Sequence, residues 1–510
     1  MQDLVTLTRQ MGAEGQIRHI HHFPARAGVR AAWPGSVHSQ VQAAYHAIGI
    51  DEPWQHQAQA LDHIAEGATT VVATGTGSGK SLPAWAQALS ATCAYQEDRH
   101  GERAGSLSFR LRRPTALFLC PTKALAVDQL ASAHGLVAAG NLPVQVARAD
   151  GDCSTAERSF AQKHADIVVT NPDFVHYSLL ARHQRWARLL GALSLIVIDE
   201  AHAYRGLTGA HVALVVRRLL RVAHRLGARP TVVFLTATVS DPYQLANAML
   251  GDCAGHIATV TEDTSAAGER HLLWWKPSDF ENNDAAYLSA AYACAGARTL
   301  TFVRARASAE AVAGQIQYLL RKESGEQTAG LKGSLRYAAY RGGYLPQERR
   351  ELEAGLKSGA LAGLVATNAL ELGIDIAGLD AVVISGWPGS RASIMQQAGR
   401  AGRAGRPGIA VFVARDDPLD IYLTDHADQV LSAGAEGTVF DLSNLHILTP
   451  HVCAAASEFP LTAADVRYFP WGQARGECTH RAAEVGSEGA DEAACERARG
   501  RPGPSAQVAL

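Results

Sequence analysis

Short, fully apolar segments recur along this chain from about residue 50, and longer stretches compatible with helices separate them. Such β-branched runs between helices are typical of parallel strands covered on both faces of a sheet. The runs form two series, which predicts an α/β fold of two tandem, doubly wound parallel-sheet domains. The first series is Thr70–Ala73, Ala116–Cys120, Ile167–Thr170, Leu195–Asp199 and Val232–Thr236, and the second is Leu300–Val303, Leu364–Ala366, Ala381–Ile384 and Ile409–Val413.

A length of 510 residues allows two or three domains, each with its own core. The polar stretch Thr261–Gly268 indicates a linker between the two series, and from Gly472 onward polar residues, Gly and Ala dominate, which predicts disorder. The expected organisation is an N-terminal extension (1–48), a first domain (49–260), a linker (261–280), a second domain (281–425), a short, mostly helical accessory region (426–470) and a disordered tail (471–510).

Composition limits the classes of partner. The formal net charge is -2, so any nucleic-acid surface must be a local groove. Eight cysteines without CxxC spacing are typical of free thiols in a reducing cytosol. We read no signal peptide and no apolar run long enough to cross a bilayer. A cytoplasmic, monomeric protein without membrane contact is expected.

A phosphate-binding loop is predicted between the first apolar strand and a helix-compatible run. Glycines at 75, 77 and 79 allow backbone N–H groups to turn inward around an anion, and Lys80 can reach the β- and γ-phosphates. The Ser81 hydroxyl can bind Mg²⁺. The strict pattern of such loops begins with Gly, whereas this loop begins with Thr74. The expected ATP-binding set is Thr74, Gly75, Thr76, Gly77, Ser78, Gly79, Lys80 and Ser81.

Two carboxylates, Asp199 and Glu200, end the most apolar strand of the chain. Acidic groups at the C-terminal edge of a buried strand indicate work on a cation or a proton. We expect Asp199 to hold Mg²⁺ through water and Glu200 to orient and deprotonate the attacking water. His202 is either a coupling residue that touches the second domain or an ordinary helix-cap histidine. The hydroxyls of Thr236 and Thr238, on the next strand end, favour coupling.

A basic run, Gln396–Arg406, alternates arginines with glycines. Two guanidinium groups one helical turn apart can meet the charge of a phosphoryl transition state, which lysine does less well. Arg400 and Arg403 are the expected catalytic arginines, and Gln396 is assigned to the coupling set. The alternative is a solvated basic helix.

Together these motifs resemble those of superfamily 2 DExH helicases, which have two RecA-like domains. In that resemblance Gln57 is the adenine contact of a Q-type motif, and Gly373 and Asp375 lie in motif V, which links strand and nucleotide. The residues that match the strand-gripping motifs are Pro121, Thr122 and Lys123 (motif Ia), Thr170 and Asn171 (Ib), Arg306 (IV) and Thr367 (V).

Finer features are similar to helicases of the MrfA/YprA type: the stretches Asp199–Gly206, Tyr340–Tyr344, Asp417–Asp420 and Asn444–Glu458. The resemblance implies an ATP- and Mg²⁺-dependent enzyme that moves 3′ to 5′ on single-stranded or tailed duplex DNA and serves DNA repair. An RNA helicase and an ATP-gated nucleic-acid clamp without unwinding activity remain alternatives.

The late part of the chain departs from that family. Members of that family carry a C-terminal domain with a four-cysteine zinc site. In this chain only Cys453, Cys478 and Cys495 occur after residue 425, and their spacing does not suit such a site. No zinc is therefore expected. Two further expectations concern single segments. Trp274 and Trp275 should pack the first strand of the second domain, and Arg217, Arg218 and Arg221 should form a solvated helix face.

Overall fold

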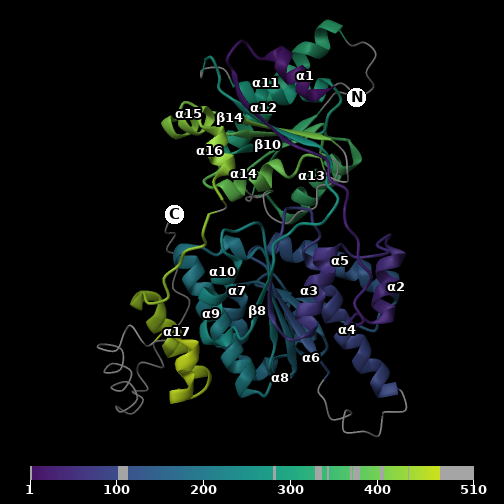
Figure 1. Ribbon diagram of the computed structural model, residues 1–510, viewed down its shortest axis with the longest axis vertical. Coiled ribbons are helices and arrows are strands. Elements are labelled where there is room, and N and C mark those ends of the chain that lie inside the picture. Colours follow the sequence, from purple (N-terminus) through teal and green to yellow (C-terminus); the bar gives the residue numbers. More distant parts are fainter. Residues whose placement is uncertain are drawn as a thin grey trace.

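The computed structural model describes residues 3–100, 113–279, 283–327, 336–341, 344–367, 370, 379–402, 407–434 and 436–470. Figure 1 shows two α/β lobes stacked along the long axis, with the first domain below and the second above. Each lobe contains a seven-stranded sheet. The predicted fold class, two tandem parallel-sheet domains, is confirmed.

The sheet of the first domain is entirely parallel, in the order β4-β5-β3-β6-β7-β2-β8. Its central strands are buried along almost their whole length because helices cover both faces. The strands are β2 (Thr69–Ala73), β3 (Thr115–Leu119), β4 (Val146–Arg148), β5 (Ile167–Thr170), β6 (Leu193–Ile198), β7 (Thr231–Thr236) and β8 (Ile257–Val260).

Two layers of helices enclose this sheet, and local capping marks where several of them begin. The Thr122 side chain accepts a hydrogen bond from the Leu125 N–H at the start of α5, and Ser154 and Glu157 form a capping box at the start of α6. One layer is α2 (Ser39–Ala47), α3 (Gln55–Ala65), α4 (Ser81–His100) and α5 (Lys123–Gly140). The other contains α6 (Thr155–Lys163), α7 (Pro172–Phe174), η3 (Val175–Leu180), η4 (His183–Trp186), α8 (Ala187–Gly191), α9 (Gly206–Arg225) and α10 (Pro242–Leu250).

The second sheet has the order β1-β9-β14-β13-β10-β12-β11, and all its neighbours are parallel except β1 and β9. The strands are β1 (Ile17–Phe23), β9 (Arg270–Trp275), β10 (Thr299–Val303), β11 (Tyr337–Tyr340), β12 (Gly363–Ala366), β13 (Ala381–Ser385) and β14 (Gly408–Val413). The helices around it are α11 (Asp284–Cys294), α12 (Arg306–Gln327), α13 (Pro346–Ser358), α14 (Arg391–Ala398), α15 (Pro418–Asp425) and α16 (Ala427–Ser432).

Two expected boundaries differ from the structure. The segment 1–48 is not a separate extension, because β1 pairs with β9 and α1 (Leu4–Met11) packs on the second sheet, where Thr8 and Tyr292 hydroxyls lie 2.6 Å apart. The segment 261–280 is not all linker, because β9 is an internal strand of the same sheet. Trp274 and Trp275 are buried there, as expected. Polar residues such as the histidines of β1 conceal these strands from an apolar pattern.

The accessory region returns to the first domain instead of staying with the second. Its helices α17 (Leu445–Glu458) and η8 (Ala463–Tyr468) pack on α9, and Figure 1 shows the chain descending from α16 to reach them. They place apolar side chains on the first-domain core: Leu448, Ala455, Tyr468 and Phe469. Residues 471–510, expected to be disordered, lie outside the described part of the chain.

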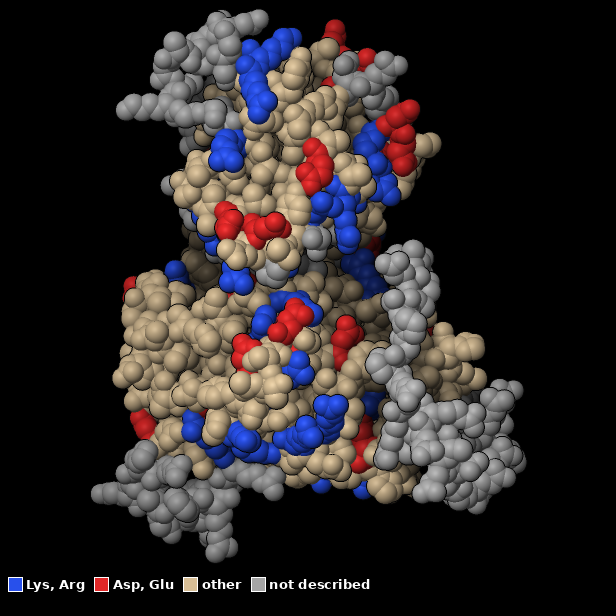
Figure 2. Space-filling view, turned by 180° about the vertical axis from the view of Figure 1, so that it is seen from behind, with Lys and Arg blue, Asp and Glu red and all other residues tan. Residues whose placement is uncertain are grey.

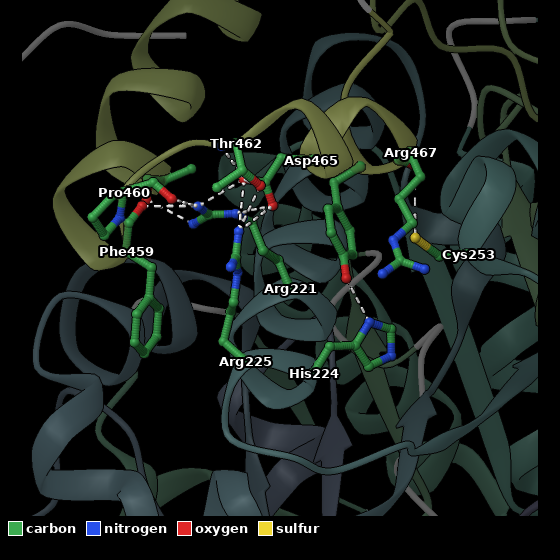
Figure 3. Close-up of polar contacts among 11 residues, drawn as sticks. Arg221, His224, Arg225, Cys253, Phe459, Pro460, Thr462, Asp465 and Arg467 are labelled. Carbon is green, nitrogen blue, oxygen red and sulfur yellow. Dashed lines mark hydrogen bonds and ion pairs between the residues drawn. The ribbon is translucent and has the colours of Figure 1, made fainter. Parts of the chain in front are cut away.

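This docking corrects the expectation for the arginines of α9. Arg217, Arg218 and Arg221 are all buried rather than solvated. Arg217 donates to the Ala248 and Met249 carbonyls, whereas Arg218 pairs with Glu458 and Arg221 with Asp465. Figure 3 shows Arg221 and Arg225 converging on Asp465, beneath the C-terminal segment. For Arg218 and Arg221 the expectation was wrong because the covering segment lies more than 230 residues away in the sequence. Arg217 is covered instead by the end of α10.

Charged side chains of both signs are spread over the rear of both lobes (Figure 2), in keeping with a net charge of -2. Of the helices that the structure describes, none combines the length and apolar character that a bilayer crossing requires.

Candidate nucleotide site between the two domains

The predicted phosphate loop connects β2 to α4 at the C-terminal edge of the first sheet. Gly77 and Gly79 have φ values of 86° and 76°, in the left-handed region that favours glycine. Thr74 and Ser78 are buried, and their hydroxyl oxygens lie 2.7 Å apart across the base of the loop. A loop of this form, directly before a long helix, suits the phosphates of a nucleotide.

Gln57 lies beneath this loop. Its side-chain amide donates to the carbonyls of Ser78 (3.2 Å) and Gly79 (2.9 Å), and its oxygen accepts from the Trp54 N–H at 2.8 Å. A Cβ atom at Gly79 would lie 2.4 Å from the Gln57 amide nitrogen, so this close approach requires glycine. The buried Gln57 therefore supports the loop in this structure, and its contact with adenine stays a prediction.

The acidic pair follows β6, which lies between β3 and β7 in the order of the sheet, with β2 on the far side of β7. Asp199 is buried and accepts a hydrogen bond from Gln129 at 3.0 Å. Burial and the neighbouring Glu200 carboxylate raise the pKa of Asp199 well above its ordinary value, while Lys80 acts in the opposite direction. A cation such as Mg²⁺ beside Asp199 would favour its ionised form.

Glu200 has an unusual backbone conformation, with φ 46° and ψ 47°. For a residue other than glycine this left-handed conformation is costly, and such residues cluster at functional sites. The Glu200 side chain is 15% exposed, and its carboxylate lies 3.5 Å from His202 Nδ1. The turn thus holds the carboxylate just past the end of β6, where it can meet a water molecule.

His202 links the acidic pair to the second domain. Its Nδ1 accepts from the Ala237 N–H (3.2 Å) and lies 3.3 Å from the Thr236 hydroxyl, so this nitrogen carries no proton. The side-chain amide of Gln396, on α14 of the second domain, lies 2.6 Å from His202 Nε2. Burial lowers the pKa of His202 to about 4, which keeps the ring neutral at pH 7. This geometry agrees with coupling.

A cleft of about 980 Å³ separates the two domains beside this link. The first domain contributes Gly75, Thr76, Gly77 and the exposed Thr238, and the second contributes Gln396 and its neighbours on α14. Thr238 lines the cleft without joining the His202 contacts, unlike Thr236. The loop glycines face this cleft, as a nucleotide between two domains would require.

The arginines of the basic run are only partly described. Arg400 is 2% exposed, while its neighbours Gly399, Ala401 and Gly402 line the cleft. Arg403, together with Gly373 and Asp375, lies outside the described residues. The catalytic role of Arg400 and Arg403 stays a prediction, and for Arg400 it requires the side chain to leave its buried position.

The residues expected to grip a strand lie on both domains and differ in exposure. Thr122 and Lys123 are exposed at the start of α5, and Arg306 is exposed at the start of α12. Lys123 pairs with Asp152 at 2.6 Å. Three others are buried: Thr367, Thr170, whose hydroxyl donates to the Ala149 carbonyl, and Asn171, which caps α7. Pro121 is half-buried. Their predicted strand contacts are not tested by this geometry.

Several cleft residues were not predicted from the sequence. Arg26 pairs with Asp263 at 3.0 Å, and a Cβ atom at Gly75 would lie 2.9 Å from the Asp263 carboxylate. Phe23 and Arg26, from the N-terminal segment, line the cleft with Asp263. No local motif marks these residues. They come from distant parts of the sequence, and the pairing of the N-terminal segment with the residues around β9 brings them together. Gln129, at Asp199, likewise lacks a local signal.

The donors fit a nucleotide with Mg²⁺. Ser81 begins α4, and Asp199 has a buried carboxylate under the influence of the Lys80 charge. Hydroxyl and carboxylate oxygens are the ligands that Mg²⁺ prefers. For zinc, Cys453 is exposed on α17 and Cys478 and Cys495 lie outside the described residues. The expected absence of zinc is a prediction that elemental analysis of the purified protein can test.

Two parallel-sheet domains, with a phosphate loop and an acidic strand end facing a cleft, define the class of tandem RecA-like nucleotide-dependent proteins. Family models agree: "DEAD/DEAH box helicase" matches residues 54–245, and "Helicase conserved C-terminal domain" matches residues 287–405.

Similar proteins narrow the class. The ATP-dependent helicase YprA of Bacillus subtilis is 34% identical over 469 residues, covering 90% of this chain and 59% of YprA. HRQ1 of Saccharomyces cerevisiae, also an ATP-dependent helicase, is 32% identical, and the match covers 91% of this chain and 42% of HRQ1. A structure of the DUF1998 helicase MrfA bound to DNA and AMPPNP has a TM-score of 0.80 and 33% sequence identity. The match covers 91% of this chain and 62% of the MrfA chain. The chain belongs to the DEAD/DEAH box helicases of the MrfA/YprA type. It spans less than two thirds of these relatives.

Proposed function

We propose that this protein is an ATP-dependent DNA helicase whose ATP hydrolysis is stimulated by DNA. The observation that carries the proposal is the contact of His202 with Gln396, 2.6 Å apart across the cleft. It joins the acidic strand end of one domain to α14 of the other. A change at the nucleotide can therefore alter the relation between the two domains.

In the proposed reaction, Lys80 and the loop N–H groups hold the phosphates. Ser81 and Asp199 would hold Mg²⁺, which would supply positive charge to the phosphoryl oxygens. Glu200 takes a proton from the attacking water. Arg400 and Arg403 stabilise the transition state when the cleft closes. The neutral His202 ring lies between the Glu200 carboxylate and the Gln396 amide and keeps the positions of these two groups linked.

Directional movement is the finer part of the proposal. The structure of MrfA, which this chain resembles, contains bound DNA and suggests DNA as the partner, and we propose 3′–5′ movement and a role in DNA repair. Exposed groups on both domains, Lys123 and Arg306 among them, would hold the phosphate backbone. Such contacts grip without reading the bases, so binding should be sequence-independent and should weaken with salt.

Strand displacement tests this proposal. Duplexes with a 3′ tail, a 5′ tail or no tail are offered with ATP, and ATP turnover is measured with single-stranded DNA and RNA of equal sequence. The expected result is displacement of the 3′-tailed duplex and stronger stimulation by DNA. Stronger stimulation by RNA would make the protein an RNA helicase. Stimulated turnover without displacement of any duplex would indicate an ATP-gated clamp.

A further inference from the structure

The segment that connects the second domain to the C-terminal helices passes beside the cleft. It continues from α16 to α17, and near its start Glu436 touches both domains. Figure 1 shows this segment crossing from the upper lobe to the lower one. None of the helicase motifs considered above includes it.

On the first domain, Glu436 lies against Arg205, three residues after His202. The Glu436 carboxylate is 3.3 Å from the Arg205 guanidinium. The same guanidinium donates through Nε to the backbone carbonyl of His202 at 2.9 Å. Glu436 is thereby one residue removed from the coupling histidine.

On the second domain, Glu436 lies at the first turn of α14. Its carboxylate accepts from the Arg391 N–H at 2.9 Å and is 3.8 Å from the Arg391 side chain. A negative charge is favourable there because helix N-termini carry partial positive charge and unpaired N–H groups. The Arg391 side chain also lines the cleft.

These contacts form a closed ring beside the cleft. It runs from the His202 ring to Gln396, along α14 to the Arg391 N–H, then through Glu436 and Arg205 back to the His202 carbonyl. The side chains of Glu436, Arg205 and Arg391 are 29%, 35% and 32% exposed, so water can replace their contacts. The ring is therefore suited to opening and closing.

The chain that follows Glu436 is held firmly on the first domain. The backbone carbonyl of Val439 accepts from the Gly206 N–H at 3.0 Å, and Phe440 packs against Gly209 so closely that a Cβ atom there would lie 2.9 Å away. Farther on, buried ion pairs fix the C-terminal helices to α9 (Figure 3). The residues after Glu436 thus tie it to the first domain, while its carboxylate also holds the start of α14 in the second.

We infer that Glu436 is a positioning residue of the ATPase cycle, which holds the start of α14 against the segment after the acidic motif. It acts in parallel with the His202–Gln396 contact and does not touch the nucleotide. This inference rests on the proposed function for its consequence in turnover, but its structural part is independent of that function. Glu436 couples the domains by electrostatic attraction to Arg205 and by a hydrogen bond to α14.

Two variants separate these contributions. Glu436→Gln removes the charge that attracts Arg205 but keeps an oxygen for the Arg391 N–H, whereas Glu436→Ala removes both. Asp441→Asn is the matched control: it lies on the same segment, loses the same charge, and its carboxylate bonds only locally, to Ser443. Two measurements on the full chain are compared: hydrogen–deuterium exchange of the ligand-free protein, and ATP turnover with saturating single-stranded DNA.

We expect exchange in residues 391–395 to rise about fivefold in Glu436→Ala and less in Glu436→Gln. DNA-stimulated turnover should fall roughly fivefold in Glu436→Ala, with little change in the KM for ATP. Asp441→Asn should match the wild type in both.

Each contrary outcome has its own meaning. Unchanged exchange in Glu436→Ala would overturn the contact between Glu436 and α14. Raised exchange with undiminished turnover would overturn its role in the cycle. If the wild type showed no DNA-stimulated hydrolysis, the proposed function and the coupling role would both be wrong, and exchange would still decide whether Glu436 holds the two domains.

Discussion

Two of the places where the described second half of the chain meets the first domain are built differently. At the cleft, the contacts are polar: Gln396 meets His202, and Glu436 meets Arg205. On α9, by contrast, Arg218 and Arg221 are buried in ion pairs, and the apolar side chains around them belong to the first-domain core.

The difference indicates that the contacts at the cleft can be broken and re-formed, whereas those on α9 must remain intact in the folded protein. The contact of Glu436 with Arg205 is partly exposed, and such polar contacts contribute little net stability, so it can be exchanged for water during a cycle. The contact of His202 with Gln396 is buried but joins neutral side chains. Breaking a buried ion pair leaves an uncompensated charge and is strongly destabilising. We therefore expect substitutions at the cleft to change turnover, and substitutions at α9 to change the free energy of unfolding.

The largest effect is expected at the cleft from Glu200→Gln. Losing the general base should lower ATP turnover by about 10²–10⁴-fold. ATP binding should persist, and the protein should be trapped closed on DNA. Turnover, ATP affinity and DNA retention measure these effects, and the midpoint of thermal unfolding should stay near that of the wild type. Turnover equal to that of the wild type would show that Glu200 is not the base.

Arg403→Ala tests the contribution of the second domain. Because an arginine reaching across the cleft stabilises the transition state, its loss should lower kcat by about 10²-fold or more, with little loss of ATP affinity. Steady-state kinetics with saturating DNA separates the two constants. A loss of affinity with kcat unchanged would reassign Arg403 to binding of the ground state.

At the α9 junction, Asp465→Ala should lower the free energy of unfolding by about 3 kcal/mol, because Arg221 loses its carboxylate in a buried site. Arg225→Ala removes the other, 36% exposed guanidinium from the same carboxylate, and should cost less than about 1 kcal/mol. Denaturant unfolding compares the two. Equal losses would contradict the distinction between buried and exposed partners.

The smallest effect concerns pH. Burial lowers the pKa of His451 to about 3 and that of His176 to about 4, below the ordinary value of about 6.5. The unfolded chain therefore binds more protons between pH 6.5 and 4, and stability must fall as the pH falls through this window. His451→Gln cannot take up this proton and should make the fall in the free energy of unfolding shallower by roughly 1 kcal/mol per pH unit or less. An unchanged slope would exclude His451 as its source.

Local sequence patterns were sufficient for the nucleotide side of the site. The phosphate loop and the acidic pair are each continuous in the sequence, so their residue types alone indicate phosphate and cation binding. The structure places both at the edge of the first sheet. The long-range contacts were not predictable in this way. β1 joins the second sheet although the whole first domain separates it from β9, and Arg221 is buried only because Asp465 returns to it.

Residue type alone gave a wrong prediction where a side chain's partner lies far away in the sequence. Three arginines on one helix indicate a solvated face unless acidic partners elsewhere in the chain cover them, and Glu458 and Asp465 carry no local signal of that role. Gln57 shows the reverse case: a motif located the residue, whereas the hydrogen bonds to Ser78 and Gly79 reveal a supporting contact that the motif did not specify.

ATP turnover with and without single-stranded DNA, in the wild type and in Lys80→Ala, tests the central claim most directly. If the chain is a DNA-driven motor, DNA should raise wild-type turnover severalfold. Lys80→Ala should weaken ATP binding and lower turnover under both conditions, because the phosphates lose their main side-chain cation. Wild-type turnover indifferent to DNA, or Lys80→Ala turnover equal to that of the wild type, would contradict the account.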